Sequence, residues 1–194
     1  MFLIFAEIVG DLMEWLYWLC SYIVGTFLTA YVIAKSKGID LSKEGSGNFG
    51  ARNIGRVVGS WAFIVTMLGD AVKGATVVMA GYALGFSMLT VVIGLICTVL
   101  GHVYPFWHKF KGGKGVATGI SGLIFVLPIG ALLLAIGFLI VLAITRSTTK
   151  GMLGAFAVYA AYFIYEWSSA SIAVFIVIFL VIWANRENIA EKFE

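Results

Sequence analysis

Long apolar stretches recur from one end of this 194-residue chain to the other. A helix needs about 20 apolar residues to cross the hydrocarbon core of a bilayer, and a helix satisfies its own backbone hydrogen bonds there. Only 12% of the residues are charged and 61% are hydrophobic, whereas soluble domains carry about 25% charged residues. The sequence therefore predicts an all-α, polytopic integral membrane protein with a single transmembrane domain over residues 1–194.

The lysines and arginines predict how the chain crosses the membrane. All of them except Lys73 fall in four clusters, at 35–60, 106–115, 146–150 and 186–192. The connections near 82–87, 128 and 166–171 contain none. Basic loops stay cytoplasmic, so the pattern predicts seven transmembrane helices with the N-terminus outside and the C-terminus cytoplasmic. The predicted spans are 16–34, 61–81, 88–105, 114–127, 129–145, 151–166 and 170–185. Small residues within them, at Gly25, Gly81, Gly94, Gly101 and Gly137, favour close helix packing.

The first polar stretch is GSGNFGARNIGR, residues 45–56, with four glycines and two arginines. Glycines let backbone N–H groups approach an anion and form a phosphate-holding nest. Arg52 and Arg56 are four residues apart, so on a helix both can reach one phosphate. The alternative interpretation is a flexible cytoplasmic loop whose arginines only set topology.

The second polar stretch is GHVYPFWHKFKGGKGVAT, residues 101–118. It is not a Walker A loop, because Gly115 follows Lys114 where that motif needs serine or threonine. Its bare amides and lysines still suit an anion, and a helix starting near Gly115 would direct a partial positive charge toward bound phosphate. The alternative is that its lysines only satisfy the positive-inside rule.

The third stretch is LGDAVKGA, residues 68–75, inside a predicted span. Asp70 and Lys73 lie three residues apart on one helical face, and an ionised residue at depth costs about 2.5–3.5 kcal/mol. The pair is therefore either mutually neutralised packing or part of a polar site. His102 lies near the cytoplasmic end of the third span, where a lone histidine is more often a hydrogen-bonded residue than a base. The residues alone indicate a membrane protein that binds phosphate at its inner surface.

In their order and spacing, these three stretches resemble the acyl-phosphate:glycerol-3-phosphate acyltransferases of the PlsY type. The resemblance covers nearly the whole chain. It implies seven membrane helices, transfer of a fatty acyl group from acyl phosphate to the 1-hydroxyl of glycerol 3-phosphate, and a place in bacterial phospholipid synthesis. It also implies a multi-pass plasma-membrane protein with its active site on the cytoplasmic face. The expected partners are both substrates, membrane lipid and an enzyme that generates acyl phosphate, with no nucleic acid, metal or cofactor.

The motifs and this resemblance together give the expected site. The catalytic residues are Ser46, Arg56, His102, Lys114 and Asn185. The residues expected to bind substrate phosphate are Gly47, Asn48, Arg52, Asn53, Asp70, Lys73, Lys111, Gly112, Gly113, Gly115, Thr118, Arg146, Arg186 and Asn188.

Three positions depart from the family pattern. Arg52 stands where threonine is usual, Met152 where a serine can contact phosphate, and Asn185 where a histidine is expected. These departures favour, as an alternative, a diverged paralogue that binds acyl phosphate or phospholipid with weak or altered activity. The charged pair Asp70 and Lys73, inside a predicted span, leaves a third hypothesis, a phosphate-linked transporter.

Overall fold

The computed structural model describes residues 2–192, and within them the chain forms helices and no strand. The predicted all-α class is confirmed. The α-helices are α1 (Phe2–Gly25), α2 (Thr29–Ser36), α3 (Ala51–Val58), α4 (Ser60–Ala83), α5 (Met88–Val103), α6 (Val116–Val126), α7 (Gly130–Thr145), α8 (Thr148–Tyr165), α9 (Ser171–Ala184) and α10 (Arg186–Ala190). Two 3-10 helices, η1 (Leu41–Lys43) and η2 (Phe106–His108), lie in the connections.

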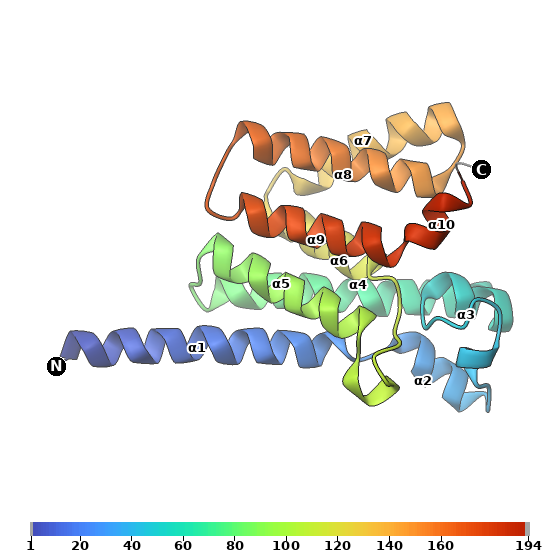
Figure 1. Cartoon of the computed structure of the whole chain (residues 1–194), viewed down its shortest axis with the longest axis horizontal. Coiled ribbons are helices and arrows are strands. Elements are labelled where there is room, and N and C mark those ends of the chain that lie inside the picture. The colour runs from blue at the N-terminus through green and yellow to red at the C-terminus, as the bar shows by residue number, and fades with distance from the viewer. Residues whose placement is uncertain (1, 193–194) are drawn as a thin grey trace.

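The longer helices lie roughly along the long axis of the molecule (Figure 1). α1 packs on α5, α4 on α6, α7 on α8, and α5 also contacts α9. The main apolar core lies between α5, α6, α8 and α9, with Leu95, Leu123, Phe156 and Val177 fully or almost fully buried. The N-terminal part of α1 projects beyond the other helices (Figure 1).

The apolar segments fall into two length classes. Glu7–Ser36, Ser60–Ala83 and Met88–His108 are long and apolar enough to cross a membrane. Val116–Val126, Gly130–Thr145 and Ser171–Ala184 are apolar but shorter. Many large apolar side chains on these helices face outward, including Leu139, Ile140 and Phe179. A helical integral membrane protein accounts for this outward apolar surface, because lipid rather than water surrounds it.

The predicted span 16–34 lies within the candidate span Glu7–Ser36, but it is not one continuous helix. α1 ends at Gly25, the chain turns through 26–28, and α2 starts at Thr29. The reason is a tertiary contact: Lys73 Nζ of α4 donates to the carbonyl oxygens of Gly25 (3.3 Å) and Phe27 (2.8 Å). These carbonyls are thereby bonded without continuing the helix. The other six predicted ranges each coincide with one helix, α4 to α9, within three residues at either end.

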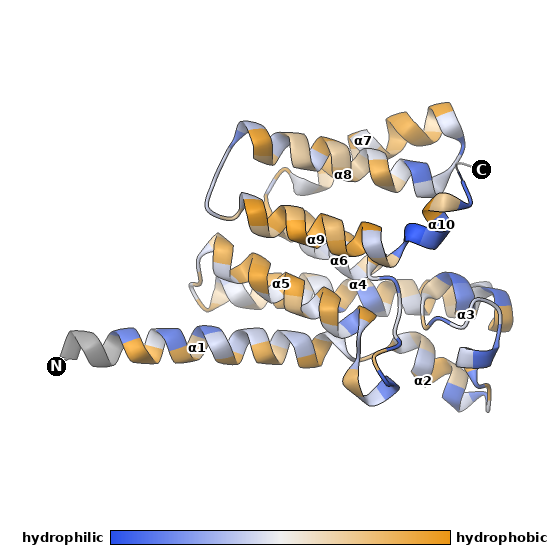
Figure 2. Ribbon diagram, viewed as in Figure 1, coloured by the Kyte–Doolittle hydropathy of each residue, from blue (hydrophilic) through white to orange (hydrophobic). Residues whose placement is uncertain are grey.

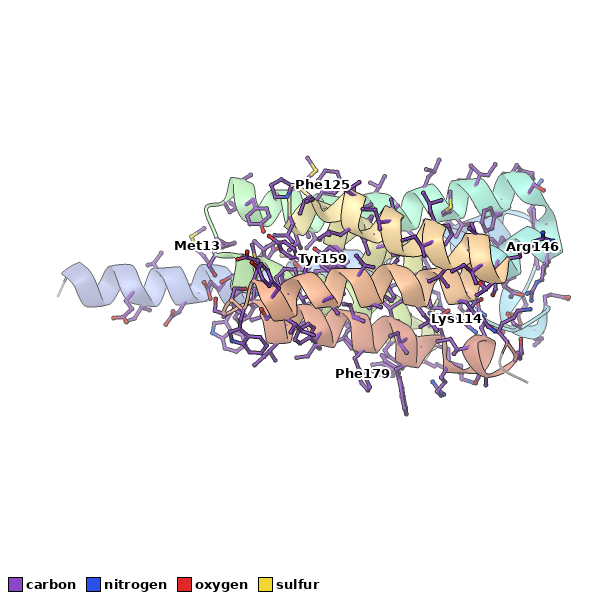
Figure 3. The ribbon with its side chains drawn as sticks, turned by 90° about the horizontal axis from the view of Figure 1, so that it is seen from above. Met13, Lys114, Phe125, Arg146, Tyr159 and Phe179 are labelled. Carbon is purple, nitrogen blue, oxygen red and sulfur yellow. The ribbon has the colours of Figure 1, made fainter. Side chains whose placement is uncertain are left out.

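Polar residues gather at one end of the bundle. Figure 2 shows hydrophilic residues concentrated around α3, α10 and the connections near them, while the long helices are mainly apolar. The three connections without lysine or arginine, 84–87, 127–129 and 166–170, lie toward the opposite end (Figure 1). Seen from above, labelled Lys114 and Arg146 both lie toward the end far from Met13 (Figure 3). The charge pattern of the sequence therefore corresponds to a spatial separation along the bundle.

Glycines make the closest helix contacts, as predicted. A Cβ at Gly25 would strike the Thr98 backbone, one at Gly101 the Tyr22 carbonyl, and one at Gly81 or Gly94 the Tyr17 ring. Between α7 and α8, a Cβ at Gly137 would strike the Gly154 carbonyl oxygen. The two backbones can approach this closely because neither residue has a side chain.

Replacing Gly137 by valine should push α7 and α8 apart. Overpacking costs about 1–3 kcal/mol, and each kcal/mol lowers the melting temperature of a chain this size by about 2–4 °C. Thermal unfolding in detergent measures the shift. Gly10→Val on α1 is the matched control, because a Cβ there meets nothing within 4 Å. Equal melting temperatures for the two variants would contradict the packing.

Candidate active site

Asn53 organises the chain before and into α3. Its side chain is 1% exposed. Its Oδ1 accepts from the Ser46 amide at 2.9 Å, and its Nδ2 donates to the carbonyls of Glu44 (3.0 Å) and Asn48 (2.9 Å). Asn48 in turn donates to the Ser46 hydroxyl at 2.8 Å. One buried amide thus folds the loop around itself and holds the exposed Ser46 hydroxyl at the surface.

The residues 111–115, here called the glycine–lysine loop, are held from three sides. The Gly112 carbonyl accepts from the Phe49 amide at 3.1 Å. The Gly113 amide donates to the His102 carbonyl at 3.0 Å. The Lys114 carbonyl accepts from Asn185 Nδ2 at 3.1 Å. Three consecutive residues are therefore fixed to three different parts of the fold.

The loop leads directly into α6. Gly115 has a φ of 71° and precedes the first helical residue, Val116. This left-handed conformation suits glycine, since it lacks a Cβ. The predicted helix start near Gly115 is confirmed, and the free amides at the N-terminus of α6 follow Lys114 immediately.

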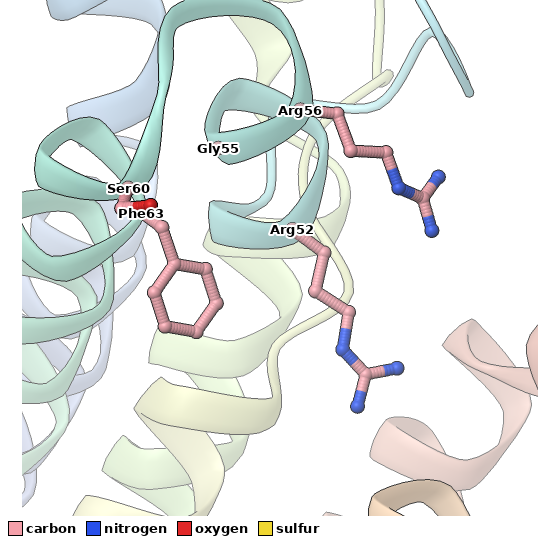
Figure 4. A pocket seen from close by; sticks show the side chains of 5 residues that line it. All are labelled: Arg52, Gly55, Arg56, Ser60 and Phe63. Atoms are coloured by element: carbon pink, nitrogen blue, oxygen red, sulfur yellow. The ribbon is translucent and has the colours of Figure 1, made fainter.

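Two arginines border a pocket at the start of α4. The pocket has a volume of about 270 Å³ and is lined by Arg52, Gly55, Arg56, Ser60 and Phe63. Figure 4 shows the two arginine side chains extending from α3 in similar directions, as their spacing of four residues predicts. Arg52 also reaches α8, where its Nη2 donates to Thr148 Oγ1 at 3.0 Å and its Nη1 to Thr149 Oγ1 at 3.5 Å. Arg52 therefore connects the arginine pocket to the start of α8.

Charged residues on α3 and on or next to α10 set the electrostatic surroundings of Lys114. Partial burial lowers the pKa of its ammonium group. Glu187 and Glu191 act in the opposite direction, while Arg52 and Arg186 lower the pKa further. Lys114 is thus a half-buried cation within electrostatic range of α3 and α10, where an anion would relieve cation–cation repulsion.

Three of the predicted residues are buried inside the helix bundle. Asp70, Lys73 and His102 are 4%, 5% and 2% exposed. Lys73 Nζ lies 3.0 Å from Asp70 Oδ1 and 2.6 Å from His102 Nδ1. The predicted phosphate ligand Thr118 is also buried, and its hydroxyl donates to the Asp70 carbonyl at 2.9 Å. These four side chains bond to the protein itself.

Five further predicted residues are exposed or partly exposed. Arg186 Nη1 donates to the Trp183 carbonyl at 3.0 Å, and its guanidinium lies over the Trp183 ring. Arg146 is exposed at the end of α7 with a φ of 51°. Lys111 is exposed, and Gly47 and Asn188 are partly exposed.

The structure shows the surroundings of two departures from the family pattern, Met152 and Asn185. Met152 is buried in the main apolar core, so no polar group is present where the family has serine. Asn185 is buried, and its Nδ2 donates to the carbonyls of Val181 (2.8 Å) and Lys114 (3.1 Å). The side chain of Asn185 therefore joins α9 to the glycine–lysine loop.

Sequence reasoning missed Thr148, Thr149 and the Phe49 amide. The run RSTTK at 146–150 offered a signal for the threonines, since hydroxyl residues beside basic ones at a helix start are available as arginine or anion partners. No side-chain pattern identifies the Phe49 amide, because every residue except proline carries the same donor. Within residues 2–192, no group of three His, Cys, Asp or Glu side chains is placed to hold a metal ion.

This arrangement defines a class: a helical membrane protein that carries glycine-rich, cationic loops at one end of its bundle. A family model described as glycerol-3-phosphate acyltransferase matches residues 15–194. Glycerol-3-phosphate acyltransferase 1 of Bacillus cereus is 42% identical over 179 residues, which cover 90% of this chain and 98% of that protein. The glycerol-3-phosphate acyltransferase of Pseudomonas putida is 34% identical over 183 residues, with 93% and 96% covered.

The structural comparison agrees. The crystal structure of PlsY (YgiH), an integral membrane glycerol 3-phosphate acyltransferase, in its glycerol 3-phosphate form has a TM-score of 0.80 and 29% identity, covering 92% of this chain and 90% of that one. Its lysophosphatidic acid form has a TM-score of 0.77 and 28% identity. The chain belongs to the glycerol-3-phosphate acyltransferase family, and the resemblance to the PlsY type is confirmed.

Replacing Asn53 by alanine should loosen the loop that precedes α3. A buried hydrogen-bonding group left without its partner costs about 1–3 kcal/mol, and each 1.4 kcal/mol changes an equilibrium about tenfold. We therefore expect trypsin to cut after the exposed Lys43 about tenfold faster, as cleavage follows loop opening. Asn188→Ala in α10 is the control, and it should leave cleavage at Lys43 unchanged. No acceleration in Asn53→Ala would contradict the organising role.

Proposed function

We propose that this chain transfers a fatty acyl group from acyl phosphate to the 1-hydroxyl of glycerol 3-phosphate, which gives lysophosphatidate and phosphate for phospholipid synthesis. The observation that carries the proposal is the Phe49–Gly112 hydrogen bond, which joins the glycine–lysine loop to the loop that leads into the arginine-bearing helix α3. Both substrates carry a phosphate. Two adjacent cationic loops suit two anions bound side by side.

The reaction needs little beyond positioning and charge neutralisation, because acyl phosphate is already activated. The 1-hydroxyl oxygen attacks the acyl carbonyl carbon, and the bond from that carbon to the phosphate oxygen breaks. The hydroxyl proton passes to an oxygen of the departing phosphate. Arg56 and Lys114 stabilise the negative charge on that phosphate, and Ser46, exposed in the loop before α3, binds a substrate phosphate through its hydroxyl. Asn185 takes no proton, since an amide is not a base at neutral pH.

The proposed membrane topology rests on the positions of the basic residues between the helices. α1 and α4 to α9 each cross once, with the N-terminus outside and the basic end of the bundle in the cytoplasm. α6 has 11 residues, so at about 1.5 Å per residue it is far shorter than the hydrocarbon core. The glycine–lysine loop at its start is therefore recessed. This depth suits a substrate with a charged phosphate and an apolar chain that extends among the helices toward lipid.

The hypothesis of a diverged paralogue rests on Met152 and Asn185. An activity measurement distinguishes such a paralogue from an active acyltransferase. Purified chain in detergent, given palmitoyl phosphate and radiolabelled glycerol 3-phosphate, should form labelled lysophosphatidate. Lys114→Ala and Arg56→Ala should each lower kcat/KM about 10²–10³-fold, the usual effect of removing one charge-stabilising group. Lys192→Ala, an exposed lysine on the same end, is the matched control. Absence of product from folded wild-type protein would refute the proposed reaction and favour the paralogue.

The lowered pKa of Lys114 gives an alkaline limit to activity. Its ammonium charge is present below that pKa and is lost as the pH rises through it. We expect kcat/KM to fall with a midpoint below the ordinary lysine value of about 10.4. Arginine stays charged throughout this range, so Lys114→Arg should move the fall to higher pH. An unchanged alkaline limb in Lys114→Arg would show that another group is responsible.

A further inference from the structure

The strongest remaining feature is the buried cluster of Asp70, Lys73 and His102, here called the Lys73 network. An ammonium group has three N–H donors. Those of Lys73 have three partners: the Gly25 carbonyl at 3.3 Å, the Phe27 carbonyl at 2.8 Å and His102 Nδ1 at 2.6 Å. The Asp70 carboxylate lies 3.0 Å away and neutralises the charge. No donor of Lys73 is left for a substrate phosphate.

The contact with Lys73 also determines which ring nitrogen of His102 carries the proton. Because Lys73 donates, Nδ1 must accept, so the ring proton of neutral His102 is on Nε2. The Nε2 side of the ring lies against Gly113, where a Cβ would collide with that nitrogen. His102 is therefore held between the lysine and the backbone of the glycine–lysine loop. Its carbonyl oxygen also accepts from the Gly113 amide at 3.0 Å.

Backbone carbonyls of α4 at and next to Asp70 also fix the start of α6. Thr118 Oγ1 donates to the Asp70 carbonyl at 2.9 Å, and Ser121 Oγ donates to the Ala71 carbonyl at 2.7 Å. A Cβ at Gly74 would collide with the Thr118 carbonyl. The glycine–lysine loop thus lies between a histidine fixed by Lys73 and a helix start fixed on the same turn of α4.

We propose that Lys73 and His102 are positioning residues that hold the glycine–lysine loop in the shape that places Lys114 against the charge developing on the departing phosphate, and that neither binds substrate or moves a proton. Lys73 connects the break between α1 and α2 to His102, and His102 supports Gly113 from behind. The proposal replaces the expected roles of a phosphate ligand at Lys73 and a catalytic group at His102. It rests on the proposed acyl transfer for its kinetic consequences, while its structural consequence is independent of activity.

A pair of substitutions at His102 separates positioning from proton transfer. Asparagine places an amide oxygen near the Nδ1 position and can accept from Lys73, but it cannot take up a proton at neutral pH. Alanine offers no acceptor. We expect His102→Asn to keep kcat within about tenfold of the wild type, and His102→Ala to lose about 100-fold, the effect of displacing positioned groups by about 1 Å. The KM for glycerol 3-phosphate should stay within about threefold in both. Equal and severe loss in the two variants would overturn the proposal in favour of a base.

Lys73→Met tests the other half of the network with a side chain of similar length and no charge. A positioning lysine gives a fall in kcat with a nearly unchanged KM, as in His102→Ala. A tenfold rise in KM for either substrate with an unchanged kcat would identify Lys73 as a substrate ligand and overturn the proposal. If this variant does not fold, the His102 pair decides the question.

Trypsin cleavage after Lys111 gives a readout that does not depend on catalysis. Gel filtration first shows that each variant is folded. We expect cleavage at Lys111 to be about tenfold faster in His102→Ala than in the wild type or His102→Asn, because opening of the loop exposes the site. Equal cleavage in all three folded proteins would overturn the positioning role. An inactive wild type with this cleavage pattern would refute only the proposed reaction.

Discussion

The fold depends on how an apolar bundle accommodates one lysine. A charged group inside the hydrocarbon region is tolerated only when other groups neutralise it and accept its hydrogen bonds. Lys73 meets both needs with Asp70 and with carbonyl groups at the end of α1. The cost of burying this cation thus explains why α1 stops at Gly25, although the sequence remains apolar for several residues beyond it.

The burial of Lys73 affects the candidate site through hydrogen bonds to the backbone of the glycine–lysine loop, and not through reactive side chains. Gly112, Gly113 and Lys114 are bonded to the loop before α3, the end of α5 and the end of α9. A loop bonded at three consecutive residues has its backbone held in one arrangement before any substrate binds. Such preorganisation is what electrostatic catalysis requires, since no reorganisation is then needed as charge develops.

The sequence predicted the parts of this structure that depend on local composition. Six of the helices followed from apolar length and from basic residues between them, and the glycine–lysine loop was recognisable because glycines and lysines together are costly beside apolar helices. The break after Gly25 was not predictable from residues 16–34, because its cause lies on α4. The same holds for His102: its sequence neighbours indicate an interface, whereas its partner Lys73 lies 29 residues away. The Arg52 contacts with Thr148 and Thr149 likewise join residues almost a hundred positions apart.

The substituted position Asn185 illustrates how the chain can tolerate a departure from its family. Its single NH2 group donates twice, to Val181 on its own helix and to Lys114 on the loop. A neutral imidazole has only one N–H donor, so a histidine there could make one of these bonds but not both. With asparagine, this position lacks a titratable ring but makes a second hydrogen bond, to the loop that carries Lys114. Where the donor is an activated acyl phosphate, whose own oxygens can take the proton, Asn185 can contribute by fixing the loop that carries Lys114 rather than by acting as a base.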